Sequence, residues 1–242
     1  MYQMLSEAPI DKPLLLVRTD DPGLADRLRR MGLSAESRFV RMAEDIMLRT
    51  VRIRGPQNDA VIGAGMAGKI VVHLNDGRKL PLAEMKPGES GHIEGSTCGA
   101  ALQRTLKTLG FGVDDRVTFL RTLPPMEYTV LIRDDARRVR VPEGMAFKIW
   151  GESGGKSLQF SMTPTGQPFL VKEILGGKKA RQGVLSYGIE PGKTLIPETV
   201  SPGQNLYIGQ KNLIIISTTD GLRLFLEECQ ARRMWVRVCE SS

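Results

Sequence analysis

The sequence has little of what extracellular, metal-rich or membrane-spanning proteins require. Its three cysteines are odd in number and lack paired spacing, which favours reduced thiols over a disulfide framework. Only two histidines are present, which argues against a histidine-rich metal centre. Apolar runs such as 14–17 and 213–216 fall far short of the roughly 20 residues of a membrane helix. The first residues lack a basic segment followed by an apolar one, so we expect a cytoplasmic protein without a secretion signal.

What is present is typical of a globular chain. Of the 242 residues, 41% are hydrophobic and 25% are charged, with a formal net charge of +7. This composition excludes a wholly disordered or fibrous protein. The length suits one large domain or two to three small ones.

An internal repeat organises the chain. Three apolar residues spaced i, i+4, i+7 are followed at once by glycine and another apolar residue, three times over, at 24–33, 102–111 and 180–189. The three glycines, Gly32, Gly110 and Gly188, are 78 residues apart. Each triplet marks one face of a short helix, and the glycine predicts a left-handed C-terminal cap. Leu28, Leu106 and Val184 are the central apolar residues of these faces.

The segments around each helix repeat as well. Stretches typical of strands follow each glycine at 38–41, 116–119 and 194–196, and alternating segments such as 50–54 and 128–132 suit half-buried antiparallel strands. A second marker centres on Ala67, Ala146 and Ala231. We therefore predict a mainly β protein of three tandem barrel-like units, each with one short helix, over 1–80, 81–156 and 157–242.

These motifs resemble the FeoA family of small SH3-like barrels. The family opening L-x-x-x-x-P-G-x-x-G-x-I is matched by residues 82–93, the helix end R-L-x-x-M-G-L by 27–33, and the following turn G-I-x-P-G by 188–192. Copies one and two lack the Pro-Gly after the helix, and copy one lacks the opening. A threefold tandem also differs from the usual single-domain member.

The resemblance implies three tandem SH3-like β-barrels and a non-enzymatic role. Members of the family accompany the ferrous-iron transporter FeoB, so the implied partner is the cytoplasmic part of an FeoB-type transporter at the inner face of the membrane. No cofactor is implied, since iron is linked through the transporter, and direct binding of Fe²⁺ stays open. The alternative is a basic nucleic-acid-binding or transcription-regulating module, because SH3-like barrels also occur in metal-dependent repressors.

Two glycine-rich stretches are similar to phosphate-binding loops. Residues 63–68 contain G-x-G-x-x-G, but the β-branched residues that follow predict a strand rather than the helix that a dinucleotide fold needs. Residues 151–157 approach a Walker A loop but are one residue too short. We interpret the first as a turn at a strand edge and the second as a linker between copies two and three.

Candidates for chemistry are few. His73 and His92 have no Cys, His or paired carboxylate at ligand spacing in the sequence, so we expect solvated or hydrogen-bonded imidazoles. Cys98 precedes a predicted helix, and we expect a small buried thiol there. With only two histidines in the sequence, no Ser/His/Asp or Cys/His constellation can be nominated, so no catalytic residue is assigned and no enzyme is predicted.

Arginine clusters provide the candidate partner-binding residues. Alternation along a strand places Arg52 with Arg54, and Arg138 with Arg140, on one face opposite apolar neighbours. A solvated exterior is one interpretation, and a docking surface for an acidic partner, a membrane headgroup layer or nucleic acid is the other. The basic hairpins lack interleaved aromatics, which weakens the nucleic-acid alternative. The complete set is Arg27, Arg29, Arg30, Arg52, Arg54, Arg138 and Arg140.

Overall fold

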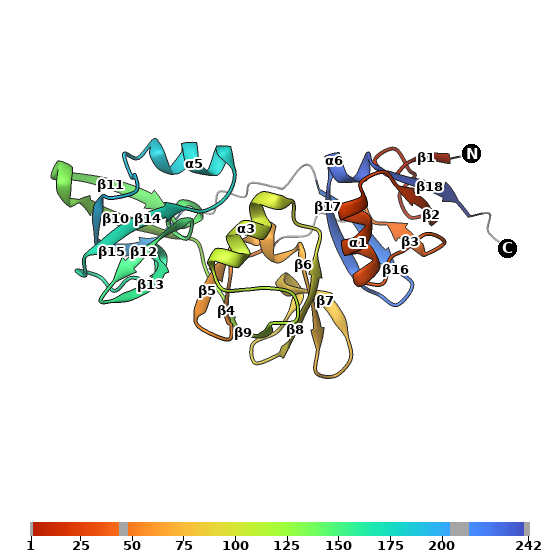
Figure 1. Ribbon diagram of the computed structural model, residues 1–242, viewed down its shortest axis with the longest axis horizontal. Helices are drawn as coiled ribbons and strands as arrows, with labels where there is room; N and C mark the ends of the chain where they lie inside the picture. Colours follow the sequence, from red (N-terminus) through yellow and green to blue (C-terminus); the bar gives the residue numbers. More distant parts are fainter. Residues whose placement is uncertain (1, 44–47, 204–212, 240–242) are drawn as a thin grey trace.

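The computed structural model describes residues 2–43, 48–203 and 213–239. These residues form a mainly β protein with three six-stranded antiparallel sheets, each of which covers its own hydrophobic core. Figure 1 shows the three units in a row, with both termini in the same end unit. The mainly β fold class is therefore confirmed.

The central unit is built from one continuous stretch of chain. Its strand order is β5-β4-β9-β8-β6-β7. The strands are β4 (Val51–Arg54), β5 (Asp59–Ile62), β6 (Ile70–Leu74), β7 (Lys79–Pro81), β8 (Ser90–Ser96) and β9 (Arg116–Thr122). Its helices are α2 (Ala64–Ala67), the 3-10 turn η1 (Leu82–Glu84) and α3 (Ala100–Thr108).

The distal unit follows along the chain and has the order β11-β10-β15-β14-β12-β13. Its strands are β10 (Met126–Ile132), β11 (Arg137–Pro142), β12 (Ile149–Ser153), β13 (Lys156–Gln159), β14 (Phe169–Ile174) and β15 (Thr194–Pro202). Its helices are η2 (Arg133–Asp135), α4 (Glu143–Ala146), η3 (Phe160–Met162) and α5 (Lys178–Leu185).

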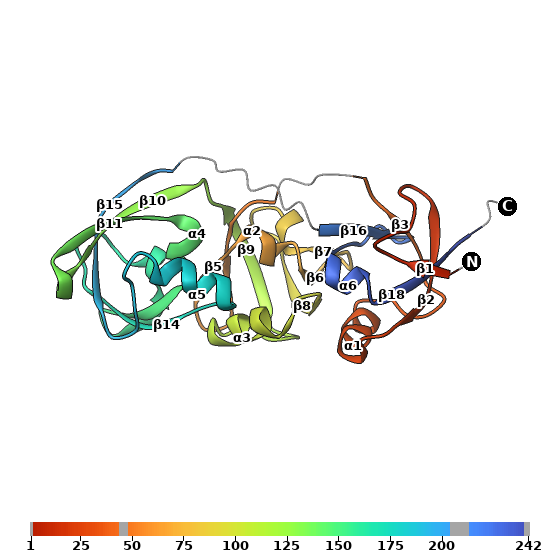
Figure 2. The same ribbon diagram turned by 90° about the horizontal axis from the view of Figure 1, so that it is seen from above.

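The third unit, here called the N/C unit, joins the two ends of the chain in the order β1-β18-β2-β3-β16-β17. Its strands are β1 (Tyr2–Met4), β2 (Pro13–Thr19), β3 (Arg38–Arg41), β16 (Leu213–Thr218), β17 (Arg223–Glu227) and β18 (Met234–Val238). Its helices are α1 (Pro22–Arg30) and α6 (Glu228–Ala231). Figure 2 shows the same row of units from above.

The predicted helix ends are confirmed. Gly32, Gly110 and Gly188 follow α1, α3 and α5 with φ of 96°, 79° and 75°, a region that only glycine occupies without strain. At the other end of α1, the Asp21 carboxylate accepts the Leu24 N–H at 3.0 Å and caps the helix. The second marker also has a structural role, because Ala67, Ala146 and Ala231 end one-turn helices and are fully buried. Each unit thus has a one-turn helix beyond the single helix predicted.

The sheets do not follow the predicted domain boundaries of 1–80, 81–156 and 157–242. Those boundaries separate the sequence copies, which run over β1–β6, β7–β12 and β13–β18. Each sheet, however, takes the first half of one copy and the second half of another: β7–β9 pair with β4–β6, β13–β15 with β10–β12, and β1–β3 with β16–β18. The copies are therefore exchanged between units, and the prediction of one barrel per copy was wrong.

The connection between β9 and β10 shows how the chain changes unit. Leu123 still donates its N–H to Thr50 in the central unit at 2.8 Å, whereas the carbonyl of Pro125 accepts the N–H of Gly203 in the distal unit at 2.9 Å. Pro124 and Pro125 lack N–H groups and favour extended backbone before them. The chain therefore crosses to the next sheet here instead of folding back as a hairpin.

The secondary structure of both glycine-rich stretches differs in part from what was predicted. Residues 151–157 do not form a linker, because β12 and β13 pair directly and Gly154 and Gly155 make the hairpin turn with φ of 57° and 74°. In the other stretch, no helix was expected after Gly63, but the structure has the one-turn helix α2 there. It leads straight into β6, so the arrangement is that of an antiparallel sheet and not a dinucleotide fold.

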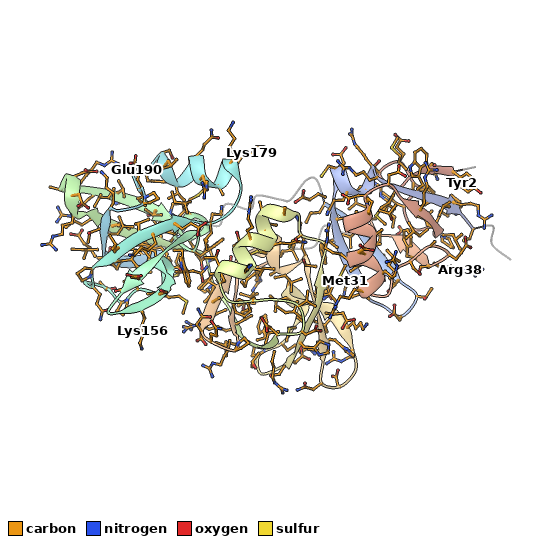
Figure 3. The ribbon with its side chains drawn as sticks, in the orientation of Figure 1. Tyr2, Met31, Arg38, Lys156, Lys179 and Glu190 are labelled. Carbon is orange, nitrogen blue, oxygen red and sulfur yellow. The ribbon has the colours of Figure 1, made fainter. Side chains whose placement is uncertain are left out.

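Neighbouring units meet at the sheet edges, β17 against β7 and β13 against β5, and α1 of the N/C unit also packs on β8 of the central sheet. Between the N/C and central units, Thr97 Oγ1 donates to the carbonyl of Phe225 at 2.5 Å, and Lys69 forms a salt bridge with Glu227. Met31 lies at the same seam against Gly95 (Figure 3). Between the central and distal units, the buried Gln159 side chain bonds to the backbone of Val61. These polar contacts are specific, which fixes how the three units are placed side by side.

Candidate functional site

The candidate site lies on the outer face of the central sheet, where three neighbouring strands place polar side chains in one row. His73 on β6 is the direct cross-strand partner of Lys79 on β7 and of His92 on β8. The apolar residues between them point into the core, because side chains alternate along a strand. The row therefore lies on the solvent side of β7, β6 and β8.

A β-bulge brings a carboxylate to this row. The register of β6 against β8 shifts between Val71 and Val72, which leaves Glu94 as the extra residue of β8. A bulge redirects the side chain of its extra residue. The bulge is held from the neighbouring unit, because Arg30 Nε of α1 donates to the carbonyl of Glu94 at 2.9 Å.

The two imidazoles and the carboxylate meet at one oxygen. Glu94 Oε2 lies 3.6 Å from His73 Nδ1 and 3.3 Å from His92 Nε2, and the imidazole rings are edge to face with centroids 5.0 Å apart. The second oxygen, Oε1, accepts from Lys79 Nζ at 3.0 Å. Burial by itself would raise the pKa of Glu94, but hydrogen bonds from Lys79 and His92 together with the charges of Lys79 and His73 lower it. The carboxylate is thus held in its ionised form.

Both imidazoles are partly exposed and contact Glu94, in line with the expectation of solvated or hydrogen-bonded histidines, but the sequence did not show that they lie together. The residues are 19 positions apart in sequence, and only the pairing of β6 with β8 brings them together. The sequence did carry one signal that could have found the site, because His92 and Glu94 are two residues apart, and side chains two residues apart on a strand share a face. Within the described residues, the ligand atoms of His73, His92 and Glu94 all lie within 4.8 Å of one another, so these three side chains could hold a metal ion.

The predicted arginine clusters lie in three different units and are not brought together. Most of them have acidic partners: Arg29 pairs with Asp26 at 2.7 Å, and both Arg52 and Arg54 pair with Asp59 at 2.9 and 3.0 Å. The predicted alternation of Arg52 and Arg54 with buried neighbours is confirmed.

On the distal hairpin, Arg138 makes a double hydrogen bond to Glu198 at 2.8 and 2.9 Å. Arg140 is exposed on the same strand, and no acidic partner is present for it among residues 2–43, 48–203 and 213–239. In the N/C unit, Arg30 reaches Asp114 of the central unit at 2.5 Å, and the charge of Arg27 helps to lower the pKa of Asp21. Arg140 is thus the cluster member that remains available to a partner.

Gly63 and Gly65 of the G-x-G-x-x-G stretch line a pocket of about 380 Å³ between the central and distal units. Its walls are largely apolar, with Phe147 packed against Gly63. Lys148 also lines the pocket, and burial lowers the pKa of its ammonium group. Cys98 is fully buried, as expected, and burial raises the pKa of its thiol to about 11, so the thiol stays protonated at neutral pH.

The fold and the site define a row of three small β units with a polar cluster on the middle one. Residues 80–153 match the family model of the FeoA domain, which supports the resemblance seen in the sequence for this segment. FeoA domains are non-catalytic accessory domains associated with ferrous-iron transport. No curated protein and no solved structure was found to be similar to the chain. Across the described ranges, every helix is too short or too polar to cross a membrane.

The matched segment coincides with one sequence copy. It runs from β7 to the end of β12. Its first half, β7–β9, belongs to the central sheet, and its second half, β10–β12, belongs to the distal sheet. The segment that matches the FeoA domain is therefore continuous in sequence but divided between two units in space.

Proposed function

We propose that the protein is a non-enzymatic accessory or regulator of ferrous-iron transport that acts by contact with the cytoplasmic part of an FeoB-type transporter. The observation that carries this proposal is the FeoA domain at 80–153. The repeat supports it further, because all three sheets have the same strand order and each could present a related surface. A tandem array raises avidity when several surfaces are engaged together.

The arrangement of the sheets leaves one basic edge for such a contact. The edge strands β5 and β7 of the central unit face β13 and β17 of its neighbours. The outer edges of the row are then β1, which has three residues, and β11, which has six. β11 carries Arg138 and Arg140, and three of its six residues are exposed. An exposed edge can pair with an extended segment, and arginines favour an acidic one.

The test is binding of the full chain to the purified cytoplasmic part of an FeoB-type transporter. Arg140→Glu reverses a charge that has no acidic partner in the described chain, and we expect it to weaken binding by about fivefold, on the order of 1 kcal/mol. Lys156→Glu makes the same charge change at the exposed first residue of β13 in the same unit, so it serves as the matched control and should bind like the parent.

Two results would contradict this proposal in different ways. If the parent chain does not bind the transporter part, the proposed partner is wrong. If it binds and Arg140→Glu binds equally well, the β11 edge is the wrong surface. The nucleic-acid alternative is checked with the same preparations, because retention on duplex DNA that falls steeply with salt would favour it.

A further inference from the structure

We infer that His73, His92 and Glu94 bind one divalent transition-metal ion on the outer face of the central sheet. Tetrahedral coordination with bonds of about 2.0–2.1 Å places ligand atoms about 3.3–3.4 Å apart. Glu94 Oε2 lies at 3.3 and 3.6 Å from the two imidazole nitrogens, and the three ligand atoms all lie within 4.8 Å of one another. The site is therefore close to the required spacing before any ion is added.

The other two units provide internal comparisons. The cross-strand pair at the position of His73 and His92 is Arg237 with Leu15 in the N/C unit and Glu152 with Leu170 in the distal unit. The bulge is present in all three sheets, and its extra residue is Val17 in the N/C unit and Lys172 in the distal unit. The barrel architecture thus needs neither a histidine pair nor an acidic bulge residue.

Both histidines of the chain are found in this one position of one unit. A fold requirement does not explain their placement, because leucine, arginine and glutamate occupy the same positions elsewhere in the molecule. A shared chemical role does explain it. Two imidazoles and a carboxylate form a common ligand set for zinc and for related first-row ions such as Fe²⁺ and Co²⁺.

The surroundings of the site leave room for water at the coordination positions of the ion that no side chain fills. The side chains of His73 and His92 are 34% and 43% exposed, so water can complete the coordination. Lys79 engages only Oε1 of Glu94 and leaves Oε2 for the ion. Lys79 and Arg116, which flank the histidines in the same row, are positively charged. They oppose the ion electrostatically, and we therefore expect a site of moderate affinity that releases its ion readily.

The site is tested with the full chain and Co²⁺ or Zn²⁺ alone at neutral pH. The parent should bind one ion at this site, and the ¹H–¹⁵N signals of both imidazoles should shift together, since no other histidine contributes. His92→Leu and Glu94→Val introduce the residues that the N/C unit has at these positions, so the fold should tolerate them. Each should weaken binding by at least about tenfold, given that loss of a supporting outer residue alone costs 10–100-fold.

Glu152→Gln and Lys172→Gln change the equivalent positions of the distal unit and should leave binding unchanged. Lys79→Gln removes an opposing charge and should tighten binding severalfold. Unfolding curves of each variant show whether the fold is kept. The proposal is overturned if neither ion shifts the imidazole signals of the parent, or if His92→Leu and Glu94→Val bind as the parent does. Cobalt absorption bands typical of thiolate ligands would instead assign the ion to a cysteine.

Discussion

Gln159 and Val61, on different units and 98 residues apart, form a pair of hydrogen bonds like that between two strands. The Gln159 amide Nε2 donates to the carbonyl of Val61 at 2.9 Å, and the N–H of Val61 donates to Gln159 Oε1 at 2.7 Å. The same amide also donates to the carbonyl of Phe147 at 2.7 Å. Gln159 is only 2% exposed, so one side chain satisfies backbone groups on both sides of a buried seam.

Replacing Gln159 with alanine should therefore destabilise the protein. It leaves the N–H and carbonyl of Val61 without partners at a buried seam, and each unsatisfied buried group costs about 1–3 kcal/mol. We expect the free energy of unfolding in urea to fall by about 2–4 kcal/mol. Gln167→Ala removes the same atoms from an exposed loop of the same unit and should change it by less than about 0.5 kcal/mol. Equal effects of the two variants would show that Gln159 does not hold the seam.

Glu143 should make stability fall as the pH rises. The side chain is buried at the start of α4, and burial raises its pKa to about 7, opposed in part by a hydrogen bond from the Met126 N–H. Between about pH 4.5 and about 7 the unfolded chain has lost this proton while the folded chain retains it, so ionisation favours unfolding. We expect a loss of about 1–3 kcal/mol across this window.

The difference between the parent and Glu143→Gln isolates this effect, because the glutamine variant cannot ionise at this position. Urea unfolding should be measured at several pH values. As the pH increases, the free energy of unfolding of Glu143→Gln should rise relative to that of the parent. Glu190→Gln changes an exposed residue of the same unit, and its free energy of unfolding should depend on pH as that of the parent does. A gap between parent and Glu143→Gln that stays constant with pH would contradict the prediction.

Gly110, at a helix end, and Gly144, inside α4, should respond to alanine in opposite directions because their backbone conformations differ. Gly110 has φ of 79°, which an alanine adopts only at a cost of about 1–2 kcal/mol. Gly144 lies inside α4 with open space where a Cβ would be, so alanine there should be neutral or stabilise the protein by up to about 1 kcal/mol. Thermal unfolding of Gly110→Ala and Gly144→Ala should shift in opposite directions, and a similar loss in both would show that space rather than conformation matters.

The exchange of strands predicts which fragment of the chain folds. Residues 48–123 contain all six strands of the central sheet, whereas residues 79–153 contain halves of two sheets. We expect the first fragment to unfold cooperatively as a monomer, and the second to be unfolded or to associate, since its strands lack their partners. Size-exclusion chromatography and amide NMR dispersion measure both. A folded monomer of 79–153 beside an unfolded 48–123 would contradict the observed pairing.

Much of the local structure could be predicted because it depends on residues close in sequence. The glycines at 32, 110 and 188 mark helix ends through their own backbone preference, and the predicted strand at 38–41 coincides with β3. The stretch at 151–157 was misinterpreted because two glycines with positive φ suit a tight hairpin turn as well as a linker. The metal-ligand cluster was missed because it needs the register of β6 against β8, which alternation alone does not define.

The sequence by itself determined that one module occurs three times, where its helices end and which side of each strand is apolar. Those properties follow from backbone preference and periodicity within a few residues. Only the tertiary structure decided that each sheet joins halves of two copies and that His73 meets His92 beside Glu94. Strand pairs of similar copies offer the same backbone hydrogen bonds with either partner, so the choice falls to the connections, such as Pro124–Pro125, that carry the chain into the next unit.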